Sequence, residues 1–198
     1  MTALRELIKS AKQLGCKVLE NEPMRLHTSF KIGGPARVFI ESGDAAALGT
    51  LLRQCHETGI PRLILGRGSN LLVADEGLSG AVLRLTGTEP PRFQDGMIRC
   101  VAGVSLSSLC RFALKNGISG LEFAWGIPGS AGGAAYMNAG AYGGEMKQLL
   151  ISCEHITPEG LPGFLPADRM ELAYRHSAYA ENGCLITALR LAAKPGDK

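Results

Sequence analysis

The feature that most constrains the fold of this chain is a twenty-residue stretch, 125–144. It reads W-G-I-P-G-S-A-G-G-A-A-Y-M-N-A-G-A-Y-G-G, with seven glycines and no Lys, Arg, Asp or Glu. Glycine inside regular structure costs about 0.5–1 kcal/mol relative to alanine, because it loses more chain entropy. We therefore expect no ordinary helix or strand here, but a loop that brings backbone N–H groups close to a flat, anionic ligand.

A second glycine-rich loop, Gly66-Arg67-Gly68-Ser69-Asn70, follows the apolar run 62–65, which we predict to be a buried strand. A glycine turn after a strand is the usual setting for an anion-binding nest of N–H groups. The loop does not fit a Rossmann site, since Leu71 stands at the third glycine position and no helix is expected after it. The chain also lacks a P-loop motif. Taken alone, the loop is better explained as a tight hairpin turn, and only the second glycine-rich stretch favours the anion-binding interpretation.

Composition limits the class of protein. The chain has 198 residues, 45% apolar and 20% charged, as in soluble globular proteins of one or two domains. A net charge of +3 with scattered basic residues predicts no nucleic-acid partner. The sequence has no signal-peptide core and no apolar run of membrane-spanning length, so we expect a cytoplasmic protein that does not contact the membrane. The oligomeric state is left open.

The six cysteines are widely spaced and include no C-x-x-C pair. This spacing favours buried thiols that act as small apolar side chains, over zinc ligands or disulfides. We predict no metal site.

Hydrophobic periodicity predicts an α+β chain. Helices are expected over 4–14, 44–58 and 105–116, strands over 36–40, 62–65, 81–85, 97–101 and 184–191, and a hairpin over 150–165. The segment 86–96 is rich in Pro, Gly and charge, and it marks a boundary between two lobes, 1–85 and 86–198.

Four motifs together resemble one family. They are H-T-S-F-K-I-G-G-P-A (27–36), G-R-G-S-N-L-L (66–72), G-I-P-G-S-A-G-G-A-A-Y-M-N-A-G-A-Y-G (126–143) and Y-R-H-S (174–177). Their order and spacing resemble those of the UDP-N-acetylenolpyruvoylglucosamine reductases, the MurB family of bacterial cell-wall synthesis. The resemblance implies a FAD-binding domain of the vanillyl-alcohol-oxidase (PCMH) type, with FAD held between two α+β lobes.

The resemblance also implies which residues form the site. The first glycine loop would wrap the diphosphate of FAD, and the second would run along the diphosphate and the flavin. The implied cofactor-binding residues are Gly66, Arg67, Gly68, Ser69, Asn70, Gly129, Ser130, Gly132, Gly133 and Ala134. Arg175 is the implied catalytic arginine. We expect Tyr136, Met137, Tyr142 and Tyr174 to serve mostly as packing, the pair Gly33-Gly34 to form a turn, and His27 and His176 to be structural.

The reaction implied by the family has two halves. NADPH reduces FAD, and the reduced flavin then delivers hydride to the enolpyruvyl double bond of a UDP-sugar, which gives UDP-N-acetylmuramate for peptidoglycan synthesis. A serine protonates the product carbanion, while an arginine and a glutamate hold the enolic charge.

Complete members of the family continue into a substrate-binding domain that carries the serine and the glutamate. We therefore expect this chain to be C-terminally truncated and nearly inactive alone. An alternative function is a non-catalytic flavin- or nucleotide-binding module. A FAD subunit of a molybdenum hydroxylase is disfavoured by the Y-R-H-S segment.

Overall fold

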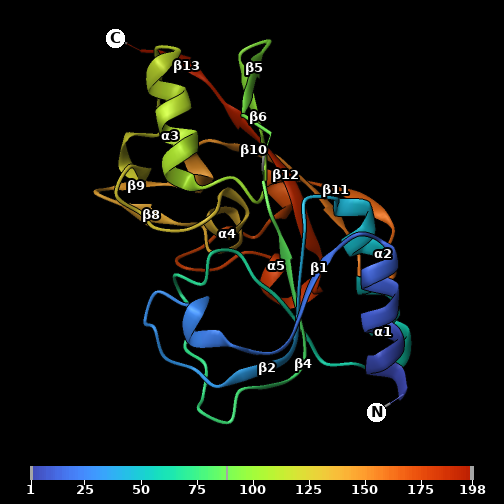
Figure 1. Ribbon diagram of the computed structural model, residues 1–198. Coiled ribbons are helices and arrows are strands. Elements are labelled where there is room, and N and C mark those ends of the chain that lie inside the picture. The colour runs from blue at the N-terminus through green and yellow to red at the C-terminus, as the bar shows by residue number, and fades with distance from the viewer. Residues whose placement is uncertain (1, 88, 197–198) are drawn as a thin grey trace. The chain divides into compact units, whose positions relative to one another are not determined.

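The chain divides into two compact units. The computed structural model describes residues 2–87 and 89–196, and its elements are labelled in Figure 1. The first unit runs to Thr86 and includes Ile156–Leu161, whereas the second contains Gly87–His155 and the chain from Pro162 onward. The sequence-based division had placed residues 156–161 in the second lobe.

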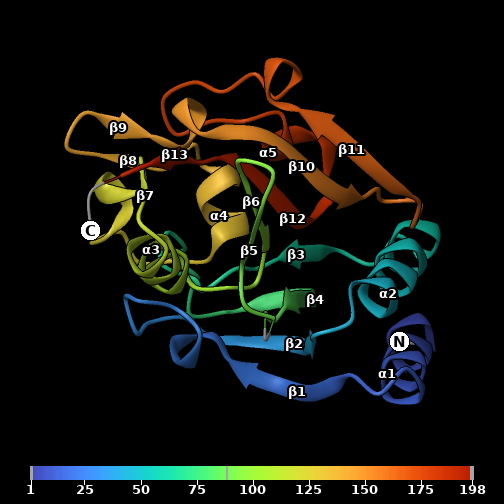
Figure 2. The same cartoon turned by 90° about the horizontal axis from the view of Figure 1, so that it is seen from above.

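A four-stranded sheet forms the centre of the first unit, as Figure 2 shows. Its strands are, in spatial order, β1 (Lys17–Pro23), β2 (Pro35–Ser42), β4 (Leu78–Leu85) and β3 (Arg62–Ile64). β1 pairs antiparallel with β2, while β2, β4 and β3 are parallel. β1 was not predicted, because it is a polar edge strand and none of its residues is fully buried.

Two helices belong to this unit, α1 (Thr2–Gln13) and α2 (Ala45–Thr58). α2 begins after Asp44, whose side chain accepts a hydrogen bond from the N–H of Ala46 at 2.8 Å, and it ends at Gly59 with a φ of 67°. Residues 156–161 pack on α2, since a Cβ at Gly49 would lie 2.9 Å from the Ile156 side chain. This contact explains why the segment groups with the first unit.

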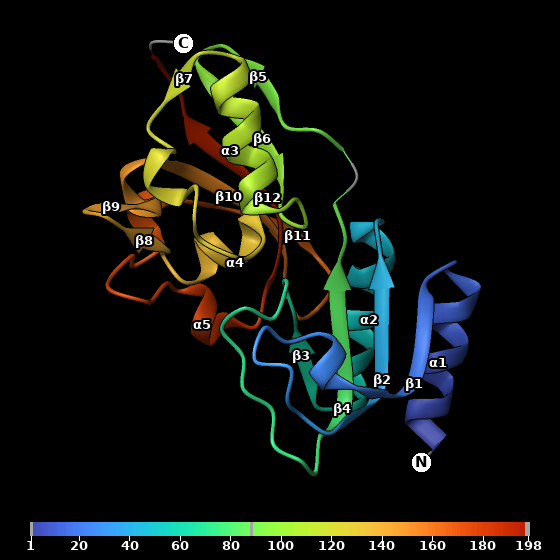
Figure 3. The same ribbon diagram turned by 60° about the vertical axis from the view of Figure 1, so that its left-hand side comes forward.

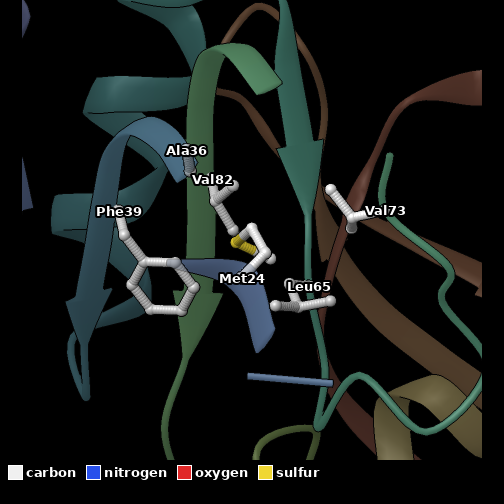
Figure 4. Packing of buried hydrophobic residues seen from close by; sticks show 6 residues of the cluster. All are labelled: Met24, Ala36, Phe39, Leu65, Val73 and Val82. Atoms are coloured by element: carbon white, nitrogen blue, oxygen red, sulfur yellow. The ribbon is translucent and has the colours of Figure 1, made fainter. Parts of the chain in front are cut away.

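One hydrophobic cluster of the first unit anchors the loops as well as the sheet (Figure 4). Phe39 and Val82 contribute from neighbouring strands, and alternation places Val38 and Ile40 on the opposite face. The buried members of the cluster are Met24, Ala36, Phe39, Leu65, Val73 and Val82. Met24 belongs to the 3₁₀ turn η1 (Met24–Leu26), and Leu65 immediately precedes the first glycine loop. That loop therefore starts from a fixed point in the core.

The second unit is built on a five-stranded sheet (Figure 3). Its order is β11 (Pro162–Pro166), β10 (Leu150–Ile156), β12 (Leu185–Ala192), β6 (Met97–Val101) and β5 (Arg92–Gln94). The predicted boundary segment 86–96 thus contains a strand, β5. Residue 88 of this segment lies outside the described residues. The expected hairpin over 150–165 is present as β10 and β11.

Three helices accompany this sheet: α3 (Leu106–Lys115), α4 (Ala131–Tyr136) and α5 (Tyr179–Asn182). α4 packs on β6 and β12, with α3 beside it (Figure 3). The smaller elements are β7 (Ile118–Ser119), which pairs with β13 (Lys194–Pro195), β8 (Gly140–Ala141), which pairs with β9 (Gly144–Glu145), and the 3₁₀ turns η2 (Glu122–Ala124), η3 (Met146–Gln148) and η4 (Ala167–Arg169).

The cysteines follow the prediction of small, buried side chains. Five of the six are buried, and no disulfide joins cysteines within the described residues. Across the same residues, no helix combines the length and the apolar character that crossing a membrane requires.

Replacing Glu154 with glutamine is expected to flatten the pH dependence of stability in acid. A hydrogen bond from Arg99 at 2.6 Å, with help from Arg190 at 3.3 Å, lowers the pKa of Glu154 although burial opposes the shift. A depressed folded-state pKa contributes stability above the unfolded value of about 4.3, and this contribution is lost as the pH falls through the folded pKa. Urea unfolding measured from neutral to acidic pH tests this.

The matched control is Glu89→Gln, which removes an exposed ion pair whose Arg92 nitrogen lies 3.7 Å from the carboxylate. The free energy of unfolding should fall less steeply with decreasing pH in Glu154→Gln than in the unchanged chain, whereas Glu89→Gln should follow the unchanged chain closely. Equal slopes for Glu154→Gln and the unchanged chain would contradict the assignment.

Candidate functional site

The first glycine loop is locked against the segment that carries the H-T-S-F motif. The N–H of Ser29 donates to the carbonyl of Gly68 at 3.1 Å. Gly68 has a φ of 66°, and a Cβ built on it would lie 1.9 Å from the carbonyl oxygen of His27. Only glycine can occupy this position without moving one of the two loops.

The Gly33-Gly34 pair fastens the other end of the same segment. The N–H of Gly34 donates to the carbonyl of Ala74 at 2.9 Å, and a Cβ on Gly34 would lie 1.9 Å from the carbonyl oxygen of Asp75. Gly33 has a φ of 128°, which favours glycine. The pair is a close backbone contact rather than the predicted turn, since the turn of this segment lies at residues 28–31, where the N–H of Lys31 donates to the carbonyl of Thr28 at 3.2 Å.

His27 stabilises the start of this segment through hydrogen bonds and a ring-stacking contact. Its Nδ1 lies 3.3 Å from Arg84 Nη1 and so accepts, which leaves Nε2 as the donor to Glu22 Oε1 at 2.8 Å. The ring stacks on Phe39 with 4.1 Å between centroids. Arg84 also pairs with Glu41. These contacts agree with the prediction of a structural histidine.

Three successive N–H groups of the first loop have no protein acceptor within the described residues. In the described ranges 2–87 and 89–196, no hydrogen bond uses the N–H of Gly66, Arg67 or Gly68. Clustered N–H groups without protein acceptors are the donor set that a phosphate requires.

The second glycine loop contains a short helix, contrary to the expectation of no helix. α4 begins after Ser130, whose Oγ accepts from the N–H of Gly133 at 3.2 Å. The N–H of Gly132 donates to Ala102 at 2.8 Å, and a Cβ on Gly132 would lie 2.7 Å from the Cβ of Ala102. The expectation was wrong because glycine at this position allows close packing against Ala102, which follows β6, rather than a left-handed backbone.

This helix changes which N–H groups of the second loop can reach a ligand. The N–H of Ala131 donates to Val104 at 2.8 Å, so Ala131, Gly132 and Gly133 all have protein acceptors. Gly129 and Ser130 lack such acceptors among the described residues. Of the predicted cofactor-binding residues in the second loop, Gly129 and Ser130 are therefore the ones whose N–H groups have no protein acceptor within the described residues.

Replacing Ser130 with alanine is expected to lower the free energy of unfolding by about 1 kcal/mol, since the cap of α4 is lost. Ser130 is 3% exposed, so water does not replace the hydroxyl. Urea unfolding measures the change. The control is Ser107→Ala, which removes a partly buried hydroxyl that lies 3.2 Å from the Ser105 Oγ but leaves Ser105, the cap of α3, in place. An equal loss in both variants would contradict the role of Ser130 as a cap.

Two tyrosines that we expected to be packed are instead exposed. Tyr142 is 96% exposed at the tip of the β8–β9 hairpin, where φ values of 52° at Tyr142 and 82° at Gly143 define a type I′ turn. Tyr174 is 89% exposed, and Tyr136 is 40% exposed. The packing prediction was wrong for Tyr142 and Tyr174, because a two-residue turn places its side chains beyond the reach of the core.

Arg175 lies in a tight turn that projects its guanidinium into solvent. Ala173 and His176 exchange two backbone hydrogen bonds of 3.2 Å, and Arg175 between them has a φ of 55°. Its guanidinium lies 5.8 Å from the centre of the Tyr174 ring. No carboxylate pairs with Arg175 in the part of the chain that the structure describes. A left-handed backbone at a non-glycine residue costs about 1–2 kcal/mol and is concentrated at functional sites.

One residue of the second glycine loop, Asn138, received no role in the sequence analysis. Asn138 is 3% exposed and makes hydrogen bonds to three separate segments. The signal was a single amide in an otherwise apolar run, since a buried amide requires partners.

Comparison with known proteins places the chain in a class. A family model described as FAD binding domain matches residues 36–161, a range that contains both glycine loops. The chain therefore belongs to the family of FAD-binding domains.

Within that class, the chain belongs to the UDP-N-acetylenolpyruvoylglucosamine reductases. The reductase of Heliobacterium modesticaldum is 42% identical over 181 residues, which cover 91% of this chain and 58% of the relative. That of Agathobacter rectalis is 38% identical, with 100% and 67% covered. The crystal structure of the enzyme (MurB) from Thermus caldophilus superposes with a TM-score of 0.76 at 32% identity, covering 92% of this chain and 63% of that one.

These matches confirm the expected fold class, an α+β FAD-binding domain of the vanillyl-alcohol-oxidase type. The chain spans 58% to 67% of the length of these two curated relatives.

Proposed function

We propose that this chain binds FAD and forms the cofactor-binding part of an NADPH-dependent reductase that converts UDP-N-acetylenolpyruvoylglucosamine to UDP-N-acetylmuramate. One observation carries the proposal: the FAD-binding match over residues 36–161 includes both glycine loops, and relatives named for this reductase align along nearly the whole chain. The proposal places the protein in the cytoplasm, where peptidoglycan precursors are made.

The diphosphate of FAD needs clustered donors, and the flavin needs backbone with few side chains beside it. We assign the diphosphate to the N–H groups of Gly66, Arg67 and Gly68, with the polar side chains of Ser69 and Asn70 alongside. In the second loop, Gly129 and Ser130 supply N–H groups, while Gly132, Gly133 and Ala134 contribute a small apolar surface. When bound, FAD would take hydride from NADPH and pass it to the enolpyruvyl double bond.

Arg175 has the chemistry that the substrate requires. The enolpyruvyl group carries a carboxylate, and a guanidinium can bind both of its oxygens at once. Negative charge develops next to that carboxylate as the double bond is reduced, so the same contact stabilises the transition state. The solvent exposure of Arg175 and its lack of a carboxylate partner within the described residues support this role.

Two additions to the FAD-loaded chain under anaerobic conditions test the function. NADPH should bleach the visible absorbance of the flavin, and reoxidation by the enolpyruvyl UDP-sugar would support the whole reaction. Bleaching without reoxidation would support the NADPH half-reaction only. Bound FAD that NADPH does not bleach would contradict the reductase and favour a non-catalytic flavin-binding module.

A further inference from the structure

We infer that Asn138 is a positioning residue that fixes the turn carrying Arg175. The inference rests on the proposed function, because it takes Arg175 as the group that meets the substrate. The contacts themselves lie entirely within the second unit.

The side chain of Asn138 links three segments. Its Nδ2 donates to the carbonyl of Ala173 at 3.0 Å and to Glu145 Oε2 at 2.9 Å, and its Oδ1 accepts from the N–H of Lys147 at 2.8 Å. The partners define the orientation of the amide, since Lys147 offers a donor and the other two offer only acceptors. One buried side chain thus ties the end of α4 to β9, to η3 and to residue 173.

The contact with Ala173 bears directly on Arg175. The carbonyl that accepts from Asn138 also accepts from the N–H of His176 at 3.2 Å, and this bond closes the turn around Arg175. On the other side of the turn, the Oγ of Ser177 donates to the carbonyl of Tyr136 at 2.7 Å. The turn is therefore fastened at both ends to adjoining residues of α4 and its C-terminus.

The guanidinium of Arg175 depends on this fastening. Arg175 is exposed, and its guanidinium contacts the ring of Tyr174, which is itself 89% exposed. Packing therefore does little to fix the side chain, and the backbone of the turn sets its location. A displacement of about 1 Å in a catalytic group can cost about 100-fold in rate, so a rigid attachment at Ala173 matters for function.

Asparagine suits this position for two reasons. Asn138 has a φ of 42°, a region that asparagine enters more readily than most residues. Its amide also supplies two donors and an acceptor, whereas aspartate at neutral pH would supply no donor. Asn138→Asp would place a carboxylate against both Glu145 and the carbonyl of Ala173, with little change in side-chain volume.

Limited trypsin digestion of the chain tests the positioning directly, because trypsin cuts after Arg175. Asn138→Asp is expected to raise the cleavage rate at Arg175 about tenfold relative to cleavage after Lys9 in α1, since the local opening of the turn becomes easier. The matched control is Asn116→Asp. It removes an amide–carbonyl bond of 2.8 Å to Phe112 at the end of α3, and it should leave the rate at Arg175 unchanged.

A second variant separates the two contacts of the amide. In Asn138→Asp combined with Glu145→Gln, the new amide at 145 can donate to the aspartate, so the link to β9 returns while the link to Ala173 does not. Fast cleavage at Arg175 should persist. Asn138→Gly, which tolerates the left-handed backbone, should behave in the same way. Unchanged cleavage at Arg175 in all three variants, or an equal rise at every site, would overturn the inference.

Substrate binding to the FAD-loaded chain distinguishes this inference from the proposed function. Asn138→Asp should raise the Kd for the enolpyruvyl UDP-sugar about tenfold, leave the Kd for FAD unchanged, and have no further effect once Arg175 is alanine. A different result would be faster cleavage of Asn138→Asp while both Asn138→Asp and Arg175→Ala bind the substrate as tightly as the unchanged chain. That result would contradict the proposed role of Arg175 and would leave the contact between Asn138 and Ala173 only structural. An effect of Asn138→Asp that persists in full without Arg175 would overturn the positioning role alone.

Discussion

Replacing Gly68 with alanine is expected to lower the free energy of unfolding by about 2–5 kcal/mol, from a left-handed backbone and a forced shift of packed groups. The added Cβ would lie 1.9 Å from the carbonyl oxygen of His27, which belongs to backbone and cannot rotate away. The displaced loop would also move the N–H groups assigned to the diphosphate, so the Kd for FAD should rise at least about tenfold. Urea unfolding and flavin titration measure the two effects.

Gly15→Ala is the matched control for that variant. Gly15 has a φ of 72°, close to the 66° of Gly68, but a Cβ built on it meets nothing within 4 Å. It should cost only the backbone strain, about 1–2 kcal/mol, and leave FAD affinity intact. Equal losses of stability and equal FAD affinities in the two variants would contradict the claim that the close approach of Gly68 to His27 positions the first glycine loop.

Replacing Arg175 with alanine is expected to weaken binding of the enolpyruvyl UDP-sugar to the FAD-loaded chain by about 10- to 100-fold. This factor corresponds to the loss of a hydrogen bond to a charged group, which contributes about 1.5–3 kcal/mol. Arg175→Lys should recover only part of the loss, because an ammonium cannot bind both carboxylate oxygens in one plane. FAD affinity should not change. Isothermal calorimetry on the loaded protein measures the Kd for the substrate, and flavin titration of the FAD-free protein measures the Kd for FAD.

Arg111→Ala, on the exposed side of α3, removes the same charge from the second unit without touching the turn. It separates a local contact from a general effect of net charge. Equal substrate affinity in Arg175→Ala and Arg111→Ala would contradict the proposal that Arg175 binds the substrate.

The sequence predicted the elements whose signals are local. Asp44 and Gly59 mark the ends of α2, and a serine, Ser105, precedes α3, so these helices were found within two residues of their bounds. β1 was missed because an edge strand carries few of the apolar residues that reveal a strand. α4 was missed for a different reason, since its Gly132 is explained by the close approach of Ala102, which follows β6 and lies about thirty residues earlier in the chain.

The candidate site was predictable as a set of motifs but not as a set of atoms. The motifs predicted both loops and Arg175, whereas the N–H groups that remain without a protein acceptor could be identified only from the structure. Gly132 and Gly133 looked equivalent to Gly129 in the sequence, yet their N–H groups bond to Ala102 and Ser130. Asn138 acquires its role only through residues 145, 147 and 173, and no local pattern connects these positions.

The most direct test of the account is the binding of FAD itself. The purified chain should be yellow or become yellow on incubation with FAD, and titration should end at one flavin per chain, with Gly68→Ala weakened and Gly15→Ala unchanged. A well-folded chain that stays colourless and takes up no FAD at saturating concentration would contradict the central claim.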